Sequence, residues 1–324
     1  MNQKRILLSL FLILFIGFLA ACASTSSSAS SDNFPDNPIR ISVGFPAGAI
    51  TDTATRTLAE AMKKNLPNNV DISIENKPGG GGVVAVTDVV NSTPDGYDIT
   101  FTPNGPLTIH THYGNTTYEY DEPTLISQTT QSDFILAVHP DSGWETFEEF
   151  KEEALANPGK LSIGTPGAGS RPDLIMQALE EQENIELTPV PFEGNAPART
   201  ALLGKDVDGI ILSDTDIIPY ASDDELKPLI NFGETTYEDF PDLPIAAEKG
   251  YDIHAFASFF FIGPNDLPNE IVTILDEAIE KSLEDPEVIE VYEQIGLTIN
   301  YRDSQELKEV IDKEYNNLGK LIHN

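Results

Sequence analysis

Residues 38–52 read PIRISVGFPAGAITD, and this stretch sets the pattern from which the fold is predicted. Its first part alternates apolar and polar residues, which is typical of a β-strand with one buried face; the apolar ones are Ile39, Ile41 and Val43. A loop and then a helix follow. Thr51 or Asp52 can serve as N-cap, because either side chain accepts hydrogen bonds from free backbone N–H groups. The apolar residues of the helix recur at helical spacing: Ala54, Leu58, and Ala61 or Met62.

The same order of strand, loop and helix repeats along the chain. Further strands are expected at 70–75, 99–102, 161–163 and 207–212, with a strand end and turn at 190–194. Further helices are expected at 83–90, after 170 and around 198–203, and one through Leu155 opens with a capping box at Thr146 and Glu149. This alternation predicts an α/β fold with doubly wound sheets. Four strands end in loops rich in Gly, Pro and small polar residues, where open α/β sheets bind ligands.

Length and composition narrow the class of protein. The 324 residues correspond to about two domains of roughly 150 residues each. The formal net charge is −34, from 19 basic and 53 acidic residues, which excludes a nucleic-acid-binding protein because that function needs a basic surface. The single cysteine, Cys22, excludes a disulfide framework, a thiolate zinc site and an iron–sulfur cluster held by this chain alone.

The N-terminus has the features of a secretory signal. Lys4 and Arg5 precede an apolar run that is too short and too asymmetrically flanked for a membrane span. The run ends in Leu-Ala-Ala-Cys, which resembles the lipobox of bacterial lipoproteins, so we expect a signal peptide over residues 1–21 and lipidation of Cys22. The alternative is an ordinary signal peptide with a spare cysteine. Residues 22–33 are expected to be a flexible tether, and the folded part to be extracytoplasmic and anchored to the cell membrane.

The loops after the strands have the composition of anion-binding sites. Glycine lets the backbone approach a ligand closely, and the helix that follows directs its free N–H groups and positive dipole end at the loop. In so acidic a protein, backbone donors are an economical way to hold a carboxylate. Each loop alone could be only a turn, and it is their combination on successive strands that is informative.

No catalytic or metal motif accompanies these loops. The sequence has neither a GxSxG nucleophile elbow nor an HExxH zinc motif, and residues 164–170 lack the lysine of a phosphate-binding P-loop. His110 and His112 are spaced to share one strand face, but we expect them to be structural or exposed, with no metal and no cofactor. Arg171 lies at the mouth of a glycine loop, where it could bind a substrate carboxylate or pair with a surface acid.

Several short strings then resemble one family when taken in order. They are PIRI (38–41), FPAG (45–48) with TD (51–52), ENKPGGGG (75–82), PDGY (94–97), NPGKL (157–161), GAGS (167–170), PFEG (191–194) with APA (196–198), ALLG (201–204) and FPDLP (240–244). Together they resemble the extracytoplasmic solute receptors of tripartite tricarboxylate transporters, over essentially the whole mature chain.

The resemblance implies a type II periplasmic-binding-protein fold. Two α/β domains, 34–132 plus 255–324 and 133–254, would be joined by crossovers near 134–138 and 256–262. They would close on a small carboxylate in the interdomain cleft and deliver it to membrane transporter subunits, without catalysis. Loops 46–52 and 167–171 would hold the carboxylate mainly through backbone groups and ordered water. The expected ligand-binding residues are Phe45, Pro46, Ala47, Gly48, Ala49, Thr51, Asp52, Asn104, Gly105, Gly167, Ala168, Gly169, Ser170, Arg171, Phe192, Glu193 and Ser213.

Three departures from the family pattern bear on the ligand. Ala49 and Ile50 stand where glycines are frequent, Glu193 replaces a frequent lysine, and Asp173 replaces a frequent histidine. Because these changes bring bulk and negative charge toward the cleft, they argue against citrate and leave a monocarboxylate, a dicarboxylate or an amino acid. Glu193 could equally point into solvent.

Two other functions stay open at this point. The receptor could sense its ligand and signal to a membrane kinase instead of serving uptake. A secreted hydrolase acting through a loop serine such as Ser170 is the alternative from another class, although no base or nucleophile elbow accompanies it.

Overall fold

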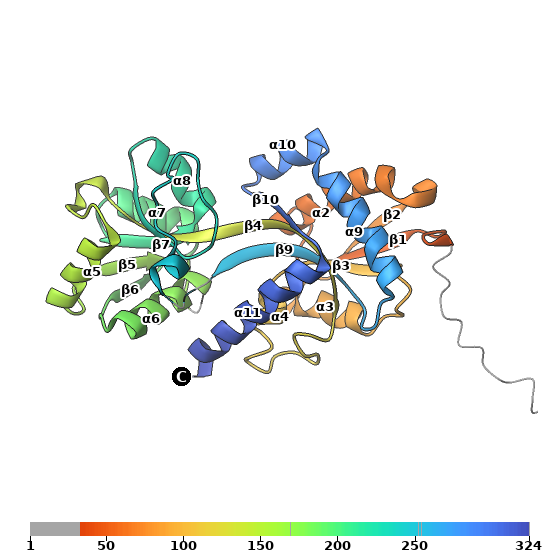
Figure 1. Cartoon of the computed structure of the whole chain (residues 1–324), viewed down its shortest axis with the longest axis horizontal. Coiled ribbons are helices and arrows are strands. Elements are labelled where there is room, and N and C mark those ends of the chain that lie inside the picture. Colours follow the sequence, from red (N-terminus) through yellow and green to blue (C-terminus); the bar gives the residue numbers. More distant parts are fainter. Residues whose placement is uncertain (1–32, 169, 252, 254, 324) are drawn as a thin grey trace, which may run out of the picture. The chain divides into compact units, whose positions relative to one another are not determined.

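The computed structural model describes residues 33–168, 170–251, 253 and 255–323. The expected signal peptide, the lipidation site Cys22 and nearly all of the tether lie outside these residues, as does Gly169. Strands and helices alternate through most of the described chain, which confirms the predicted α/β class (Figure 1). Within the same residues, no helix has both the length and the apolar composition that a membrane crossing requires.

Ten strands and ten α-helices are found among the described residues. The strands are β1 (Ile39–Val43), β2 (Ile72–Asn76), β3 (Asp98–Pro103), β4 (Thr124–Val138), β5 (Ser162–Thr165), β6 (Thr188–Pro191), β7 (Gly209–Ser213), β8 (Lys227–Asn231), β9 (Phe256–Gly263) and β10 (Ile299–Arg302). The helices are α2 (Ile50–Asn65), α3 (Val83–Val90), α4 (Gly105–Thr108), α5 (Phe147–Ala156), α6 (Arg171–Glu183), α7 (Asn195–Leu203), α8 (Asp214–Ser222), α9 (Asn269–Leu283), α10 (Pro286–Gln294) and α11 (Ser304–His323).

Strand β4 takes part in two sheets. The strand order is β2-β1-β3-β9-β4-β7-β5-β6, and β8 and β10 also pair with β4. Up to Asp133, β4 pairs with β9 and β10, and from Phe134 onward it pairs with β7 and β8 (Figure 1). We call the residues built on the first sheet, 35–133 and 256–323, the first lobe, and residues 134–255 the second lobe. Both belong to one compact unit.

The parallel strands of each sheet bring their following loops to one edge. In the first lobe β1 lies between β2 and β3, all parallel, and in the second lobe β5 lies between β6 and β7, again all parallel. The carboxyl ends of parallel strands meet at the same edge of a sheet. The loops after β1, β2 and β3 therefore share one edge, and so do those after β5, β6 and β7.

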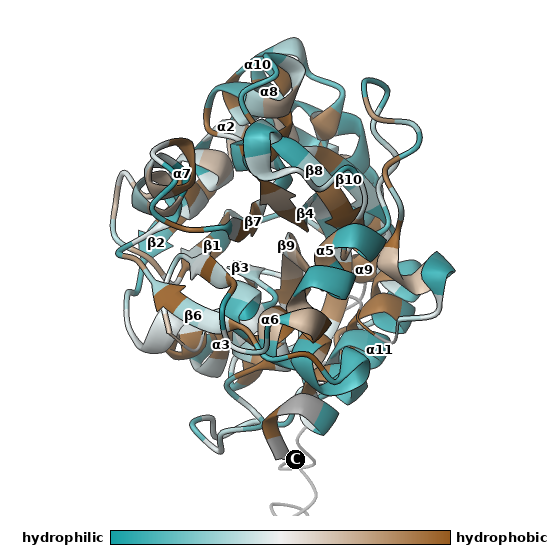
Figure 2. Cartoon of the chain, turned by 90° about the vertical axis from the view of Figure 1, so that its left-hand side faces the viewer, coloured by the Kyte–Doolittle hydropathy of each residue, from teal (hydrophilic) through white to brown (hydrophobic). Residues whose placement is uncertain are grey.

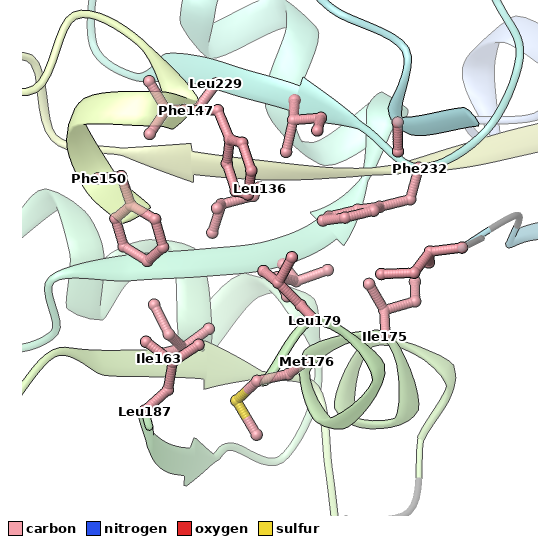
Figure 3. Close-up of a cluster of buried hydrophobic side chains, with 14 of the residues drawn as sticks. Leu136, Phe147, Phe150, Ile163, Ile175, Met176, Leu179, Leu187, Leu229 and Phe232 are labelled. Carbon is pink, nitrogen blue, oxygen red and sulfur yellow. The ribbon is translucent and has the colours of Figure 1, made fainter. Parts of the chain in front are cut away.

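The central strands of the second lobe's sheet, β4 and β7, are buried on both faces. Leu136 and Val138 belong to a core with α5 and α6, whereas Ile135 and Ala137 belong to a core with α7 and α8. This follows from the strand period of two, which sends successive side chains to opposite faces. Figure 3 shows Leu136 among Phe147, Phe150 and Leu179, and Figure 2 shows β4 and β7 in the colour of hydrophobic residues. A parallel sheet covered on both faces is the expected doubly wound arrangement.

The point where β4 changes sheets is organised by the buried carboxylate of Asp133. Asp133 is fully buried and accepts hydrogen bonds from Gln131 Nε2 (2.8 Å), Asn231 Nδ2 (3.0 Å) and the backbone N–H groups of Glu234 (2.9 Å) and Thr235 (2.7 Å). A Cβ atom on Gly233 would lie 1.9 Å from Asp133 Cγ, so only glycine fits there. Asp133 thus holds the connection after β8 against β4.

Of the local elements predicted from the sequence, some are confirmed and others are wrong. The helix over 83–90 is confirmed as α3, and Thr146 caps α5 by accepting from the N–H of Glu149 (3.2 Å). The prediction of Thr51 or Asp52 as N-cap is wrong, because α2 begins at Ile50 and its N-cap residue is Ala49. The prediction that His110 and His112 share a strand is also wrong: residues 109–114 form turns after α4, and His112 stacks on Tyr315 at 4.0 Å between ring centroids.

Candidate ligand-binding site

The loop from Gly44 to Ala49 leads from β1 into α2 and leaves the start of that helix uncapped. Ala49 is the N-cap residue, and no side chain caps the helix. The N–H of Gly48 donates to Asp52 Oδ2 (2.8 Å) and that of Ala49 to Pro46 O (3.1 Å). The N–H groups of Ile50 and Thr51 belong to the first turn, whose donors have no partner within the helix. The loop therefore ends at backbone N–H donors and at the positive end of the helix dipole.

Asp52 fixes the shape of this loop. Its carboxylate is 3% exposed and accepts from Gly48, from Asn76 Nδ2 (2.8 Å) and from Arg56 Nη2 (2.9 Å). Burial opposes the charged form, but the hydrogen bonds from Arg56, Gly48 and Asn76 outweigh it and hold the pKa of Asp52 below its usual value. Because its oxygens are already engaged, Asp52 positions the loop, and the loop backbone is left to meet an anion.

The loops after β2 and β3 pack closely against the loop after β1. A Cβ atom on Gly44 would lie 2.5 Å from the Cα atom of Gly82, and one on Gly82 would lie 3.0 Å from Pro106 and 3.5 Å from the Phe45 ring. Gly82 also has a φ of 107°, in the left-handed region that favours glycine. Asn76 Nδ2 ties β2 to the backbone oxygen of Phe45 (3.0 Å). Phe45 and Gly105, which begins α4, therefore lie at one edge of the first sheet.

The start of α6, in the second lobe, is largely occupied. Ser170 is the N-cap, and its hydroxyl accepts from the N–H of Asp173 (3.4 Å). The second helical residue, Pro172, has no N–H to offer. Gly167 and Ala168 are in the preceding loop, where the N–H of Ser170 donates to Gly167 O (3.2 Å); Gly169 lies outside the described residues. This helix start thus presents fewer donors than that of α2.

The acid that pairs with Arg171 is a buried one on α11, and the expected contact with a substrate carboxylate stays a prediction. Its side chain is 8% exposed and forms an ion pair with Glu314 of α11, while Nη2 lies 3.4 Å from Thr108 Oγ1. Burial lowers the pKa of Arg171 to about 9, so the guanidinium remains charged at neutral pH. The expectation of a surface acid is wrong, since Glu314 is fully buried.

Asn104 shares that carboxylate. Its Nδ2 donates to both oxygens of Glu314 (2.9 and 3.0 Å) and to Phe256 O (3.0 Å). Glu314 was absent from the residues predicted from sequence. It lies far along the chain in an acid-rich helix, and only its alignment with the apolar face of α11, beside Ile311 and Leu318, distinguishes it from the solvated acids.

The loop after β6 packs on the loop after β5. The N–H of Phe192 donates to Thr165 O (2.8 Å), and a Cβ atom on Gly164 would lie 3.1 Å from the Phe192 ring. Glu193 is exposed. Ser213, at the end of β7, donates to Asp216 Oδ2 (3.0 Å), and Asp216 forms an ion pair with Arg199. Ser213 therefore belongs to a polar network with α7 and α8.

Most of the predicted residues thus form three contact groups, and Ser213 stands apart in its network with Asp216. The three groups are Phe45 to Asp52 with the loops after β2 and β3, Arg171 and Asn104 joined by Glu314, and the loops after β5 and β6. Four surface cavities of about 490 to 830 Å³ are lined by other residues. Among the described residues, no group of three or more His, Cys, Asp or Glu is arranged to hold a metal ion.

Several known proteins are similar to this chain in sequence and in fold. A protein of Cupriavidus necator, the UPF0065 protein in the gbd 5′ region, is 31% identical over 288 residues, 88% of this chain and 86% of its own. The crystal structure of a TctC solute-binding protein from Polaromonas matches with a TM-score of 0.85 at 27% identity, over 90% of this chain and 99% of that one. The periplasmic binding protein BugD matches with a TM-score of 0.62 at 26% identity, over 90% and 98% of the two chains.

More distant structures share the fold. Two proteins of Rhodopseudomonas palustris, MatC with bound malate and another with adipate, match with TM-scores of 0.63 and 0.64 at 23% and 22% identity, each over 89% of this chain and over 100% and 97% of theirs. The predicted periplasmic-binding-protein fold is therefore confirmed. The family described as "Tripartite tricarboxylate transporter family receptor", TctC, matches residues 54–324. The chain therefore belongs to this family of solute receptors and is not an enzyme.

Proposed function

We propose that the chain is a lipid-anchored extracytoplasmic receptor that binds a small organic carboxylate and delivers it to the membrane subunits of a tripartite tricarboxylate-type transporter. The observation that carries the ligand class is the uncapped start of α2 after Ala49, at the carboxyl edge of the first sheet. Backbone donors and a positive helix end at such a place favour a negatively charged group.

The pairing of the arginines supports recognition by the backbone. Each of the five described arginines forms an ion pair with a carboxylate: Arg40 with Asp98, Arg56 with Asp52, Arg171 with Glu314, Arg199 with Asp216 and Arg302 with Glu234. A ligand carboxylate that used one of them would have to share a guanidinium charge already paired with a protein carboxylate, or displace that carboxylate. The backbone N–H groups at the uncapped start of α2 face no such competing carboxylate.

The two domains are proposed as residues 34–132 plus 255–324, and 133–254, closing on the ligand by a hinge. The change of pairing partners along β4 between Asp133 and Phe134 supports this boundary, because β4 leaves the first sheet and enters the second at this point. The proposed ligand contacts are the loop from Phe45 to Asp52 and Gly105 in the first domain. In the second they are residues 167–171, Phe192, Glu193 and Ser213.

Mono- and dicarboxylates are the proposed ligands. The malate and adipate bound by the two Rhodopseudomonas palustris proteins are both dicarboxylates. The asymmetry between the two helix starts supports one strongly held carboxylate at α2. An amino acid is the third class, in which the exposed carboxylate of Glu193 would attract the ammonium group.

The test of this function is a binding panel on the purified mature protein. Mono-, di- and tricarboxylates and amino acids are added one at a time, and the thermal midpoint and the heat of binding are measured. A saturable rise of the midpoint with one class, with the acid recovered unchanged, is the expected result. If no carboxylate or amino acid binds, the proposal is overturned. Uptake by a strain that lacks the protein then separates transport from sensing.

The lipid anchor at Cys22 is proposed from the sequence. We expect the wild-type protein in the membrane fraction of its own cells and the Cys22→Ser variant in the soluble fraction, because a thioether-linked lipid is the only anchor proposed. Equal fractionation of the two proteins would contradict the anchor and leave the ligand proposal intact.

A further inference from the structure

A buried ion pair joins the two lobes. Arg171 is the first residue of α6 in the second lobe, and Glu314 lies on α11 in the first lobe, which packs against α6. Their side chains are 8% and 0% exposed. Thr108 of the first lobe adds a hydroxyl 3.4 Å from Arg171 Nη2. A cation of one lobe thus inserts into a polar pocket of the other.

The first lobe holds its half of the pair in place independently of the second. Asn104, which is 2% exposed, donates through Nδ2 to both oxygens of Glu314 and to the backbone oxygen of Phe256, the first residue of β9. The carboxylate is therefore oriented by α4 and β9 of its own lobe. The guanidinium arrives from α6, directly after the loop with residues 167–170.

A second ion pair between the lobes, among the described residues, differs in exposure and position. Arg302 of β10, whose side chain is 14% exposed, pairs with Glu234, whose side chain is 39% exposed and whose N–H donates to Asp133, where β4 changes sheets. A pair with one exposed partner gains and loses less on opening than a fully buried pair, because water replaces the protein partner. A buried pair behaves differently: a closed arrangement with one partner missing leaves an uncompensated buried charge.

We propose that Arg171 and Glu314 form a matched latch, which makes the arrangement of the two lobes seen in this structure favourable only when both charges are present. Separation of the lobes rehydrates both groups, so either group without the other favours a more separated arrangement. Part of the inference rests on the proposed function: since closure completes the ligand site, ligand affinity should depend on Glu314, a residue outside the ligand loops.

The test measures the separation of the lobes without ligand. Spin labels are placed at Glu152→Cys on α5 and Glu280→Cys on α9, two exposed positions, in the Cys22→Ser chain, and the distance distribution between them is recorded. We expect Arg171→Met and Glu314→Gln each to lengthen or broaden the distribution. The double variant, with both charges removed, should return toward the wild-type distribution. If Arg171→Met does not fold, Glu314→Gln, which keeps the shape of the side chain, carries the test.

A matched control is the ion pair between Lys151 and Glu183, which joins α5 and α6 within the second lobe at 3.0 Å with 24% and 19% exposure. Lys151→Met should leave the distance distribution unchanged. Wild-type distributions in both single variants would overturn the latch. So would a double variant as open as the singles, because that result indicates a packing role without charge matching.

Ligand affinity provides the second measurement. With whichever acid the binding panel identifies, each single variant should bind about 5- to 150-fold more weakly, the usual range for coupling between two sites, and the double variant should recover part of this loss. If the wild-type protein binds none of the acids but the single variants still open, the proposed function fails and the latch stands. If affinity is high in every variant, the latch fails and the function stands.

Discussion

The loops after β1 and β5 occupy equivalent positions but end on different chemistry. Each follows the middle one of three parallel strands and leads into a helix. At α2 no side chain caps the helix, and Asp52 turns back to brace the loop from within. At α6 the Ser170 hydroxyl takes one donor, Pro172 lacks another, and Arg171 turns toward α11. The comparison supports the two proposals, in which the first loop binds the charge of a ligand and the second controls closure.

The largest effect is expected where the first loop is braced. Asp52→Ala leaves the N–H of Gly48 without its acceptor, removes one of the two acceptors of the Asn76 amide, and removes the ion-pair partner of Arg56. We expect the free energy of unfolding to fall by about 2–4 kcal/mol, since each buried group that loses its partner costs about 1–3 kcal/mol. Urea denaturation measures the change. Glu60→Ala, on the same helix, removes an exposed carboxylate that pairs with Lys63 and should cost less than about 1 kcal/mol; equal losses would contradict this role of Asp52.

A substitution at Ala49 gives α2 a side-chain cap, which α6 already has in Ser170. Ala49→Asp places a carboxylate on the uncapped donors of α2, which should raise the free energy of unfolding by about 1 kcal/mol. The same carboxylate competes with the ligand, so affinity should fall by about 10- to 100-fold, the equivalent of losing one charge-assisted hydrogen bond of about 1.5–3 kcal/mol. Calorimetric titration measures the affinity. Ala49→Ser, a cap without charge, should weaken binding less, and full affinity in Ala49→Asp would show that the ligand does not use α2.

The cap of the second loop should matter less. Ser170→Ala removes the acceptor of the Asp173 N–H and should lower the free energy of unfolding by about 1 kcal/mol. Ligand affinity should change by less than about 3-fold, because the hydroxyl serves the helix. Thr146→Ala, which uncaps α5 away from the ligand loops, is the matched control for stability. A much larger loss of affinity in Ser170→Ala would mean that Ser170 contacts the ligand directly.

The smallest effect concerns pH. The pKa of Asp52 is lower in the folded protein than its usual value, so its charged form stabilises the fold. This stabilisation is present above about pH 4, the pKa of an unfolded aspartate, and is lost as the pH falls through the lower folded pKa. The difference in urea midpoint between the wild type and Asp52→Asn should therefore shrink below about pH 4. A constant difference from pH 3 to pH 7 would show that the carboxylate contributes no charge-dependent stability.

The sequence predicts helices and strands well wherever the apolar residues follow a single helical or strand period. The valine-rich helix over 83–90 and the Thr146 cap follow from spacing and from side-chain chemistry, and both are confirmed. The N-cap prediction for α2 is wrong because the Asp52 carboxylate can accept from N–H groups that follow it or precede it in the chain. The sequence pattern does not show that it accepts from the N–H of Gly48, which precedes it. His110 and His112 have strand spacing, but the helical turn of α4 before them sets a different path.

The long-range contacts of the candidate site could not be predicted in the same way. Arg171, Asn104 and Glu314 are separated by much of the chain, and nothing in the acid-rich sequence of α11 singles out Glu314 as the partner. Their meeting depends on the strand order, in which β9 lies between β3 and β4. The loops themselves were recognisable, because glycine and proline mark where the strands end.

The position of β9 has a consequence for how the chain acquires its fold as it is made. Thr100 of β3 pairs with Ile262 of β9, so the whole second lobe separates two neighbouring strands of the first sheet. A polypeptide that emerges with its N-terminus first exposes the unpaired edge of β3 until the second lobe has been synthesised and exported. Such edges recruit other strands, and distant pairings form slowly. The time between the appearance of β3 and that of β9 is therefore when newly exported chains are most open to aggregation.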